Sequence, residues 1–309
     1  MNTFAPAFQF VPCLRPRASV EKDFDPKSAG LLIVLSGRSN PGVATLHIET
    51  IQSLDAPELA LYRTLRRPFE HERDGVLVAT NVKVLQRLLA SRFPVVSVLL
   101  TPAWLERLEP SLRARPEDLR VYLGEQALLE TLTGYQLHQG ALAVAKIPPQ
   151  PSFEELFANA PRPLLLAAVE GIANAENLGG IVRSCAAFGV SFLIVGETCG
   201  SPFQRRAVSG SMGTIFEQPV VRVDNLAEAL TALRACGIRC LAAHPRPGAK
   251  KLAAMDLRGD CCLVFGAEGP GLTPATLAAC DDVVEIPMPS HMNSLNVAVA
   301  TGVFLYEAT

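Results

Sequence analysis

Several features that would define a function class at once are missing from this 309-residue sequence. No apolar run approaches the ~20 residues that span a bilayer. The N-terminal segment contains prolines where an export signal would have an apolar core. There is no C-x-x-C among the eight cysteines, which lie mostly beside Leu, Val and Ala, as buried reduced thiols do. We therefore expect a cytoplasmic protein with no export signal, no membrane partner and no bound metal.

A basic excess is also missing. The formal net charge is −2. Residues 48–150 carry equal numbers of basic and acidic side chains, and acidic ones predominate in residues 151–309. A non-specific nucleic-acid binder is expected to be basic, so any RNA contact must depend on local clusters. The candidate RNA contacts lie in two predicted helices and in the small-residue run after the second: Arg63, Arg66, Arg67, Arg205, Arg206 and Ser209. For Arg205 and Arg206, simple solvation is the alternative.

A glycine-rich turn follows the apolar run 261–265, but it matches neither of the familiar phosphate-binding motifs. Gly266, Gly269 and Gly271 are ordered G-x-x-G-x-G, whereas a dinucleotide fingerprint needs G-x-G-x-x-G. No Gly-Lys-Ser/Thr follows, so the turn is not a P-loop. Taken alone, it could be ordinary turn chemistry.

Polar residues beside this turn favour a ligand site. Glu268 lies inside the turn, and Asn293, Ser294 and Asn296 follow the next predicted strand. In open α/β sheets, ligands bind where loops leave the carboxyl ends of neighbouring strands. A brace within the loop remains the alternative role for Glu268.

Strands and helices alternate along most of the sequence, which predicts an α/β protein. In the second half, the expected strands alternate with helices, and a terminal helix begins at Ser294; the strands are 163–169, 191–195, 220–223, 238–242, 261–265 and 283–287. Such alternation predicts a parallel sheet covered on both faces. The first half predicts a smaller α/β domain, whose strands 75–79, 95–100, 120–123 and 141–145 follow a helix over 56–67. A proline-rich segment ends it, giving four regions: an N-terminal extension 1–47, a small domain 48–148, a linker 149–160 and a second domain 161–309.

Two polar residues mark the helix after the strand 163–169. Asn177 can cap this helix, which is an ordinary structural role. Arg183 lies about two turns further on among apolar residues, where it must pair or face an anion.

Three motifs in order resemble the SpoU/TrmH family of RNA 2′-O-ribose methyltransferases, within the SPOUT superfamily. The first begins at Asn177 and reads NLGGIVRSCAAFG. The second is FGAEGPGL at 265–272, followed by IPM at 286–288, and the third is SLNVAVATGVFLYE at 294–307. The resemblance covers about residues 163–309, with mild departures such as Ala298 where serine is frequent. The small domain is similar, more weakly, to the family's RNA-recognition domain.

The resemblance implies a trefoil-knotted domain that binds S-adenosyl-L-methionine and a homodimer with each active site at the subunit interface. The substrate would be rRNA or tRNA, methylated on a ribose 2′-hydroxyl. The implied cofactor contacts are Gly266, Gly269, Gly271, Leu272, Ile286, Met288, Ser294, Leu295 and Ala298. The implied catalytic residues are Arg183, Asn177, Glu268, Ser294 and Asn296.

The role of Arg183 stays open at this point. The family's proposal makes it the base, but its pKa above ~12 makes arginine a poor base. We expect it to orient the hydroxyl or a neighbouring phosphate. A non-catalytic RNA-binding or ribosome-assembly protein with the same fold is the alternative function. A nicotinamide-dependent oxidoreductase is disfavoured by the order of the glycines.

Overall fold

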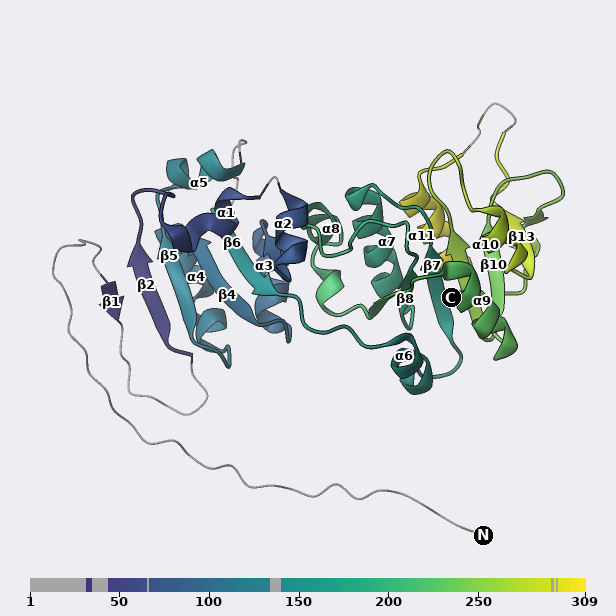
Figure 1. Cartoon of the computed structure of the whole chain (residues 1–309), viewed down its shortest axis with the longest axis horizontal. Helices are drawn as coiled ribbons and strands as arrows, with labels where there is room; N and C mark the ends of the chain where they lie inside the picture. Colours follow the sequence, from purple (N-terminus) through teal and green to yellow (C-terminus); the bar gives the residue numbers. More distant parts are fainter. Residues whose placement is uncertain (1–31, 35–43, 66, 134–139, 290–291, 293) are drawn as a thin grey trace, which may run out of the picture. The chain divides into compact units, whose positions relative to one another are not determined.

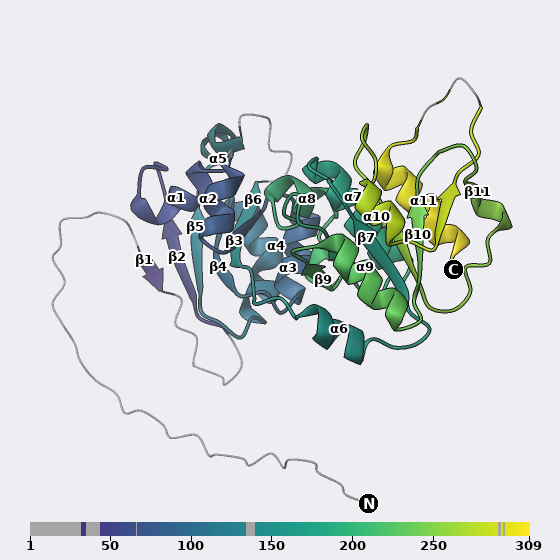
Figure 2. The same cartoon turned by 45° about the vertical axis from the view of Figure 1, so that its right-hand side comes forward.

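The computed structural model describes residues 32–34, 44–65, 67–133, 140–289, 292 and 294–309, and they form two β-sheets with their covering helices (Figures 1 and 2). By their contacts, residues 31–309 make up one compact unit. No helix in the described ranges is long and apolar enough to cross a membrane.

The first sheet is mixed and has the order β1-β2-β5-β4-β6-β3. Its strands are β1 (Leu32–Val34), β2 (Leu46–Thr50), β3 (Val76–Ala79), β4 (Val95–Leu100), β5 (Leu119–Leu123) and β6 (Ala141–Lys146). The pairs β2–β5 and β5–β4 are parallel, and the other neighbours are antiparallel. Its helical segments are η1 (Pro57–Leu59), α1 (Ala60–Arg63), α2 (Pro68–Arg73), α3 (Val82–Ala90), α4 (Pro102–Arg113) and α5 (Gln126–Thr133).

The predicted continuous helix over 56–67 is wrong. It is divided into η1 and α1, and α2 then begins at Pro68. The residue before a proline is pushed out of the helical region, and Arg67 accordingly has φ −117° and ψ 70°. The predicted extension 1–47 also supplies β1, which pairs with β2.

The predicted linker 149–160 contains a helix that we did not expect. The helix α6 (Phe153–Asn159) begins with a capping box, in which Ser152 and Glu155 each bond the other's backbone N–H. The sequence signal, Ser-x-x-Glu before apolar residues, was present. Phe153, Leu156 and Phe157 pack against the core of the second sheet.

The second sheet is entirely parallel, as predicted, and has the order β11-β13-β10-β12-β7-β8-β9. Its strands are β7 (Leu165–Val169), β8 (Leu193–Val195), β9 (Val220–Arg222), β10 (Arg239–Ala243), β11 (Lys250–Lys251), β12 (Cys261–Phe265) and β13 (Asp282–Glu285). Its helical segments are α7 (Ala175–Ala187), α8 (Arg205–Gly210), η2 (Thr214–Phe216), α9 (Leu226–Ala235), η3 (Leu252–Ala254), α10 (Pro274–Ala278) and α11 (Val297–Glu307). Residues of α7 and α11 belong to one apolar core and residues of α9 to another, so both faces are covered. The last helix, α11, begins at Val297 after the N-cap Asn296, and not at Ser294 as expected.

The cysteines among the described residues are free thiols, and five of the seven are buried. Burial raises the pKa of Cys185 to about 12 and that of Cys261 to about 11, so both stay protonated at neutral pH. No group of three potential metal ligands lies together within the described ranges.

Candidate active site

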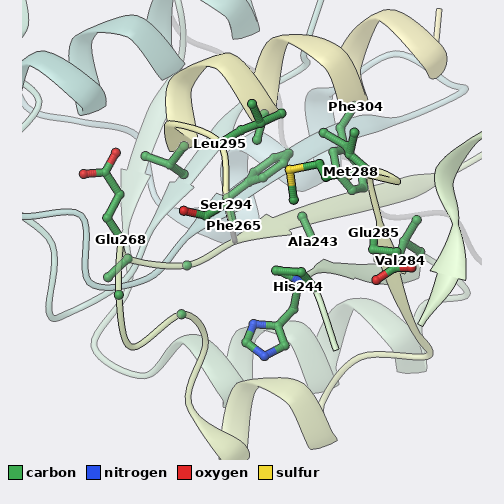
Figure 3. Close-up of a pocket in the computed structure, with 18 residues that line it drawn as sticks. Ala243, His244, Phe265, Glu268, Val284, Glu285, Met288, Ser294, Leu295 and Phe304 are labelled. Atoms are coloured by element: carbon green, nitrogen blue, oxygen red, sulfur yellow. The ribbon is translucent and has the colours of Figure 1, made fainter. Parts of the chain in front are cut away.

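A cavity of about 400 Å³ opens at the carboxyl ends of three neighbouring strands, β10, β12 and β13. This is the edge at which ligands of open α/β sheets bind. Figure 3 shows the apolar side chains of Phe265, Met288, Leu295 and Phe304 around the cavity, with Glu268 and His244 toward its margins. The rings of Phe265 and Phe304 meet edge to face at 5.6 Å. The cavity therefore offers an apolar slot with few polar side chains.

Seven of the nine predicted cofactor contacts line this cavity, namely Gly266, Gly269, Gly271, Ile286, Met288, Ser294 and Leu295. Leu272 is instead buried in the core on the α9 side, and Ala298 packs beside Gly180. Sequence reasoning missed the end of β10, where Ala243, His244 and Pro245 also line the cavity. The signal was available, because β10 was predicted and its carboxyl end lies at the same edge of the sheet.

Gly266 fixes the shape of the glycine turn. A Cβ at this position would lie 2.4 Å from the carbonyl carbon of Gly271 and 2.6 Å from the backbone nitrogen of Leu272. The turn is closed by a bond from the Gly271 N–H to the Ala267 carbonyl, 3.1 Å long. The two ends of the turn are thus in backbone contact, with no room for a side chain between them.

A buried carboxylate that the sequence analysis overlooked anchors the far side of this turn. Glu170 directly follows β7 and is only 5% exposed. It accepts hydrogen bonds from the Thr273 N–H (2.7 Å), the Thr273 hydroxyl (2.9 Å) and the Thr276 hydroxyl (2.7 Å). Negative charge is favourable at a helix N-terminus, and here it faces the first turn of α10. Glu170 therefore ties β7, the strand before the first motif, to α10, the helix that follows the second motif.

The three motifs meet in a polar chain beside the cavity. The Asn296 Nδ2 donates to Asn177 Oδ1 at 2.8 Å and to Glu268 Oε1 at 2.9 Å. The Oδ1 of the same side chain caps α11 by accepting from the N–H groups of Ala298 and Val299. One asparagine thus fixes the position of the last helix, the first motif and the glycine turn together.

The predicted capping role of Asn177 is wrong. Asn174 caps α7 by accepting from the N–H groups of Glu176 (2.8 Å) and Asn177 (3.1 Å). Asn177 lies in the first turn of the helix, which leaves its side chain available for Asn296.

The glycine pair of the first motif lies inside α7 and lets other segments approach closely. A Cβ on Gly179 would lie 2.4 Å from the Ala207 carbonyl oxygen in α8. A Cβ on Gly180 would lie 2.9 Å from the Ala298 Cβ in α11. The pair therefore serves helix packing.

Arg183 lies away from the cavity. It is six residues beyond Asn177, which places its side chain about 120° around the helix axis. It is exposed and lines a separate groove with residues of α3 and of the segment after α8. No hydrogen bond or ion pair joins its side chain to any residue in the described ranges.

The predicted RNA-contacting residues have varied surroundings. The Arg63 guanidinium donates to the Leu54 and Ala56 carbonyls, Arg67 pairs with Glu70 at 3.1 Å, and Arg205 donates to the Leu65 carbonyl. Ser209 bonds Thr80 at 3.3 Å, and Arg206 is exposed. Arg66 and Asn293 lie outside the described residues. Their RNA contacts stay predictions.

The fold and the site define an α/β protein with an apolar cavity at the carboxyl edge of a parallel sheet, where ligands of such sheets bind. Residues 164–306 match the SpoU rRNA Methylase family. An uncharacterized tRNA/rRNA methyltransferase of Mycobacterium bovis is 35% identical over 271 residues, which cover 85% of this chain and 92% of the relative. The 23S rRNA (guanosine-2′-O-)-methyltransferase RlmB of Xanthomonas campestris is 35% identical over 66% of this chain and 82% of its own length.

The solved structures agree in fold. An rRNA methyltransferase of Sinorhizobium meliloti with bound AdoMet superposes with a TM-score of 0.72 at 23% identity, covering 84% of this chain and 97% of that one. The chain therefore belongs to the SpoU family of RNA methyltransferases, which confirms the resemblance carried by the three motifs. The methyl donor of this family is S-adenosyl-L-methionine.

The cavity fits this cofactor in size and lining. Its volume lies within the ~300–1,000 Å³ typical of small-molecule sites, which are mostly apolar with a few polar groups. The glycine turn lines the cavity with backbone at Gly266, Gly269 and Gly271, and the space beside Gly269 is open.

Proposed function

We propose that this protein transfers a methyl group from S-adenosyl-L-methionine to a ribose 2′-hydroxyl of rRNA or tRNA. The observation that carries the proposal is the Asn177–Asn296–Glu268 chain, which brings residues of all three motifs to the rim of the apolar cavity. A non-catalytic RNA-binding protein would not need this chain beside a cavity of cofactor size.

When bound, S-adenosyl-L-methionine would supply an activated methyl group, so alignment with the hydroxyl would provide much of the rate. The C–S bond breaks as the C–O bond forms, S-adenosyl-L-homocysteine leaves, and the hydroxyl proton passes to solvent. In the proposal, the apolar walls and the backbone of the glycine turn hold the donor. Asn177 holds the ribose or a phosphate, and Asn296 keeps Asn177 and Glu268 in place. Glu268 and Ser294 lie at the cavity, where they can hold the incoming ribose. Arg183 orients the hydroxyl or the neighbouring phosphate and stabilises negative charge.

The position of Arg183 supports a shared active site in a homodimer. Arg183 does not line the cavity of its own chain. On α11, large apolar side chains are exposed, including Val299 (54%), Val303 (40%) and Tyr306 (72%). Exposed apolar patches of this kind mark interfaces. We propose that two protomers meet on this face and that Arg183 of one protomer serves the cavity of its partner.

Three further features belong to the proposal. The helix α11 packs against α7, β12 and η3, and this packing supports a trefoil knot in the second domain. The sheet β1–β6 with its helices is proposed as the RNA-recognition domain. The free buried thiols support a reducing compartment such as the cytoplasm.

Ribose methylation is tested by the product. We expect mass spectrometry of rRNA and tRNA to show one 2′-O-methyl nucleotide that is lost when the gene is deleted and regained when it is restored. No change at any nucleotide, in a protein that binds S-adenosyl-L-methionine by calorimetry, would contradict the proposal. Failure to bind the cofactor would favour the non-catalytic alternative.

The shared site is tested by mixing two inactive variants. Arg183→Ala is expected to bind the cofactor normally but to lose methyl transfer. Gly266→Ala, whose added Cβ distorts the glycine turn, is expected to be inactive because it no longer binds the cofactor. Refolded together, the two should regain about a quarter of wild-type activity, because a mixed two-fold dimer has one intact site. Cofactor binding by Arg183→Ala with no recovery on mixing would show that Arg183 acts within its own chain.

A further inference from the structure

Three cationic side chains from two distant parts of the sequence line one groove. Lys83 and Arg87 belong to α3, and Arg183 belongs to α7. The groove has a volume of about 440 Å³ and is completed by Ala186, Ala187, Met212, Thr214 and Glu217. Three cations against one carboxylate make it locally positive, although the whole chain has a net charge of −2.

The two cations of α3 face the groove together. They are four residues apart and therefore lie on one face of the helix. The Arg87 Nη1 donates to the Met212 carbonyl at 3.2 Å, and a Cβ on Gly213 would lie 3.2 Å from the Arg87 Cβ. This contact holds α3 against the segment between α8 and η2.

These cations keep donors available for an anion. The side chains of Lys83 and Arg183 are exposed, and neither side chain has a hydrogen bond or ion pair with any residue in the ranges that the structure describes. Arg87 uses one bond of its guanidinium, which has five N–H donors. The three cations favour an anionic ligand, and a phosphodiester chain matches this lining in charge and in hydrogen bonding.

We propose that this groove binds the phosphodiester backbone of the RNA substrate next to the target ribose, with Lys83 and Arg87 as substrate-positioning residues. The inference rests on the proposed function, since Arg183 joins the groove to the transfer step. It assigns RNA binding to α3, which the sequence analysis did not select. Backbone contacts position a strand without reading its sequence.

The test uses substitutions of opposite sign in the full-length protein. Lys83→Gln removes one cation, and Glu217→Gln removes the carboxylate. Arg87 is left unchanged because its stem packs on Gly213. Lys146→Gln is the matched control, because Lys146 is an exposed lysine at the end of β6 that does not line the groove. The probes are unmodified in-vitro transcripts of 16S rRNA, of 23S rRNA and of a pool of tRNAs.

Lys83→Gln is expected to raise the KM for the RNA substrate about 5- to 10-fold, with kcat and the Kd for S-adenosyl-L-methionine unchanged. The slope of log affinity against log salt should fall by about 0.7 to 1, the loss of one phosphate contact. Glu217→Gln should lower the KM, and Lys146→Gln should leave both quantities at wild-type values.

Filter binding of the same transcripts separates this inference from the proposed function. If the wild type turns over and Lys83→Gln has the same KM and the same salt slope, RNA binding by the groove is contradicted. Methylation as the proposed function is then unaffected. If wild type shows no turnover on any transcript, the proposed function fails. The groove then stands only if Lys83→Gln and Glu217→Gln shift RNA affinity in opposite directions.

Discussion

Replacing Gly266 by alanine is expected to reduce the affinity for S-adenosyl-L-methionine at least 100-fold. The added Cβ would overlap the backbone of Gly271 and Leu272, so the turn must open by roughly an ångström. Such contacts cannot be relieved by rotating a side chain, because both neighbours are main chain. Isothermal titration calorimetry measures the loss, and circular dichroism checks that the sheet still forms.

Gly269→Ala is the matched control for steric closure. Gly269 has φ +91°, so alanine is strained there, but nothing lies within 4 Å of the added Cβ. Alanine in left-handed backbone costs about 1–2 kcal/mol, so we expect a lower melting temperature and a decrease in affinity of about 10-fold or less. Equal losses in the two variants would mean that backbone strain, and not the close contact at Gly266, controls the cavity.

Substitution of Asn296 is expected to separate stability from catalysis. Asn296→Ala loses both the cap of α11 and the bonds to Asn177 and Glu268. A lost cap costs about 1 kcal/mol, which lowers Tm by about 2–4 °C. Asn296→Ser keeps a capping oxygen but loses the Nδ2 donor. We expect both variants to lose about 100-fold in kcat/KM, since small misplacements near the reacting groups have effects of that size.

The measurements are methyl transfer to RNA and thermal unfolding. Asn225→Ala is the control, because Asn225 caps α9 through the Glu228 N–H in the same way and does not line the cavity. It should match Asn296→Ala in Tm and wild type in activity. Full activity of Asn296→Ser would show that the polar chain is only a structural cap.

Local patterns in the sequence predicted the parallel sheet, because its strands are buried apolar runs separated by helices. They also predicted much of the cavity, since the glycine turn and the segment 286–295 follow strands whose carboxyl ends meet. Contacts between residues distant in sequence could not be predicted. Nothing local indicates that Glu170 bonds Thr273, or that Asn296 bonds both Asn177 and Glu268.

The surroundings of Arg183 could not be predicted from its local sequence either. Its motif placed it with Asn177, whereas the pitch of α7 turns the two side chains to different surroundings. The companions of Arg183 in its groove, Lys83 and Arg87, come from a helix almost one hundred residues earlier. A solvated lysine and a phosphate-binding lysine have the same local sequence, so only the assembled groove distinguishes them.

The cavity is built from four segments that leave the ribosome at different times, at 243–245, 265–271, 284–288 and 294–304. Chains are synthesised from the N-terminus and domains fold as they emerge. A nascent chain that has reached β13 therefore has the sheet strands of the cavity but not its wall on α11. A ligand that binds only the finished cavity shifts the equilibrium toward it by mass action. If S-adenosyl-L-methionine binds in this cavity, as proposed, its cellular level would be coupled to the packing of α11 that completes the cavity.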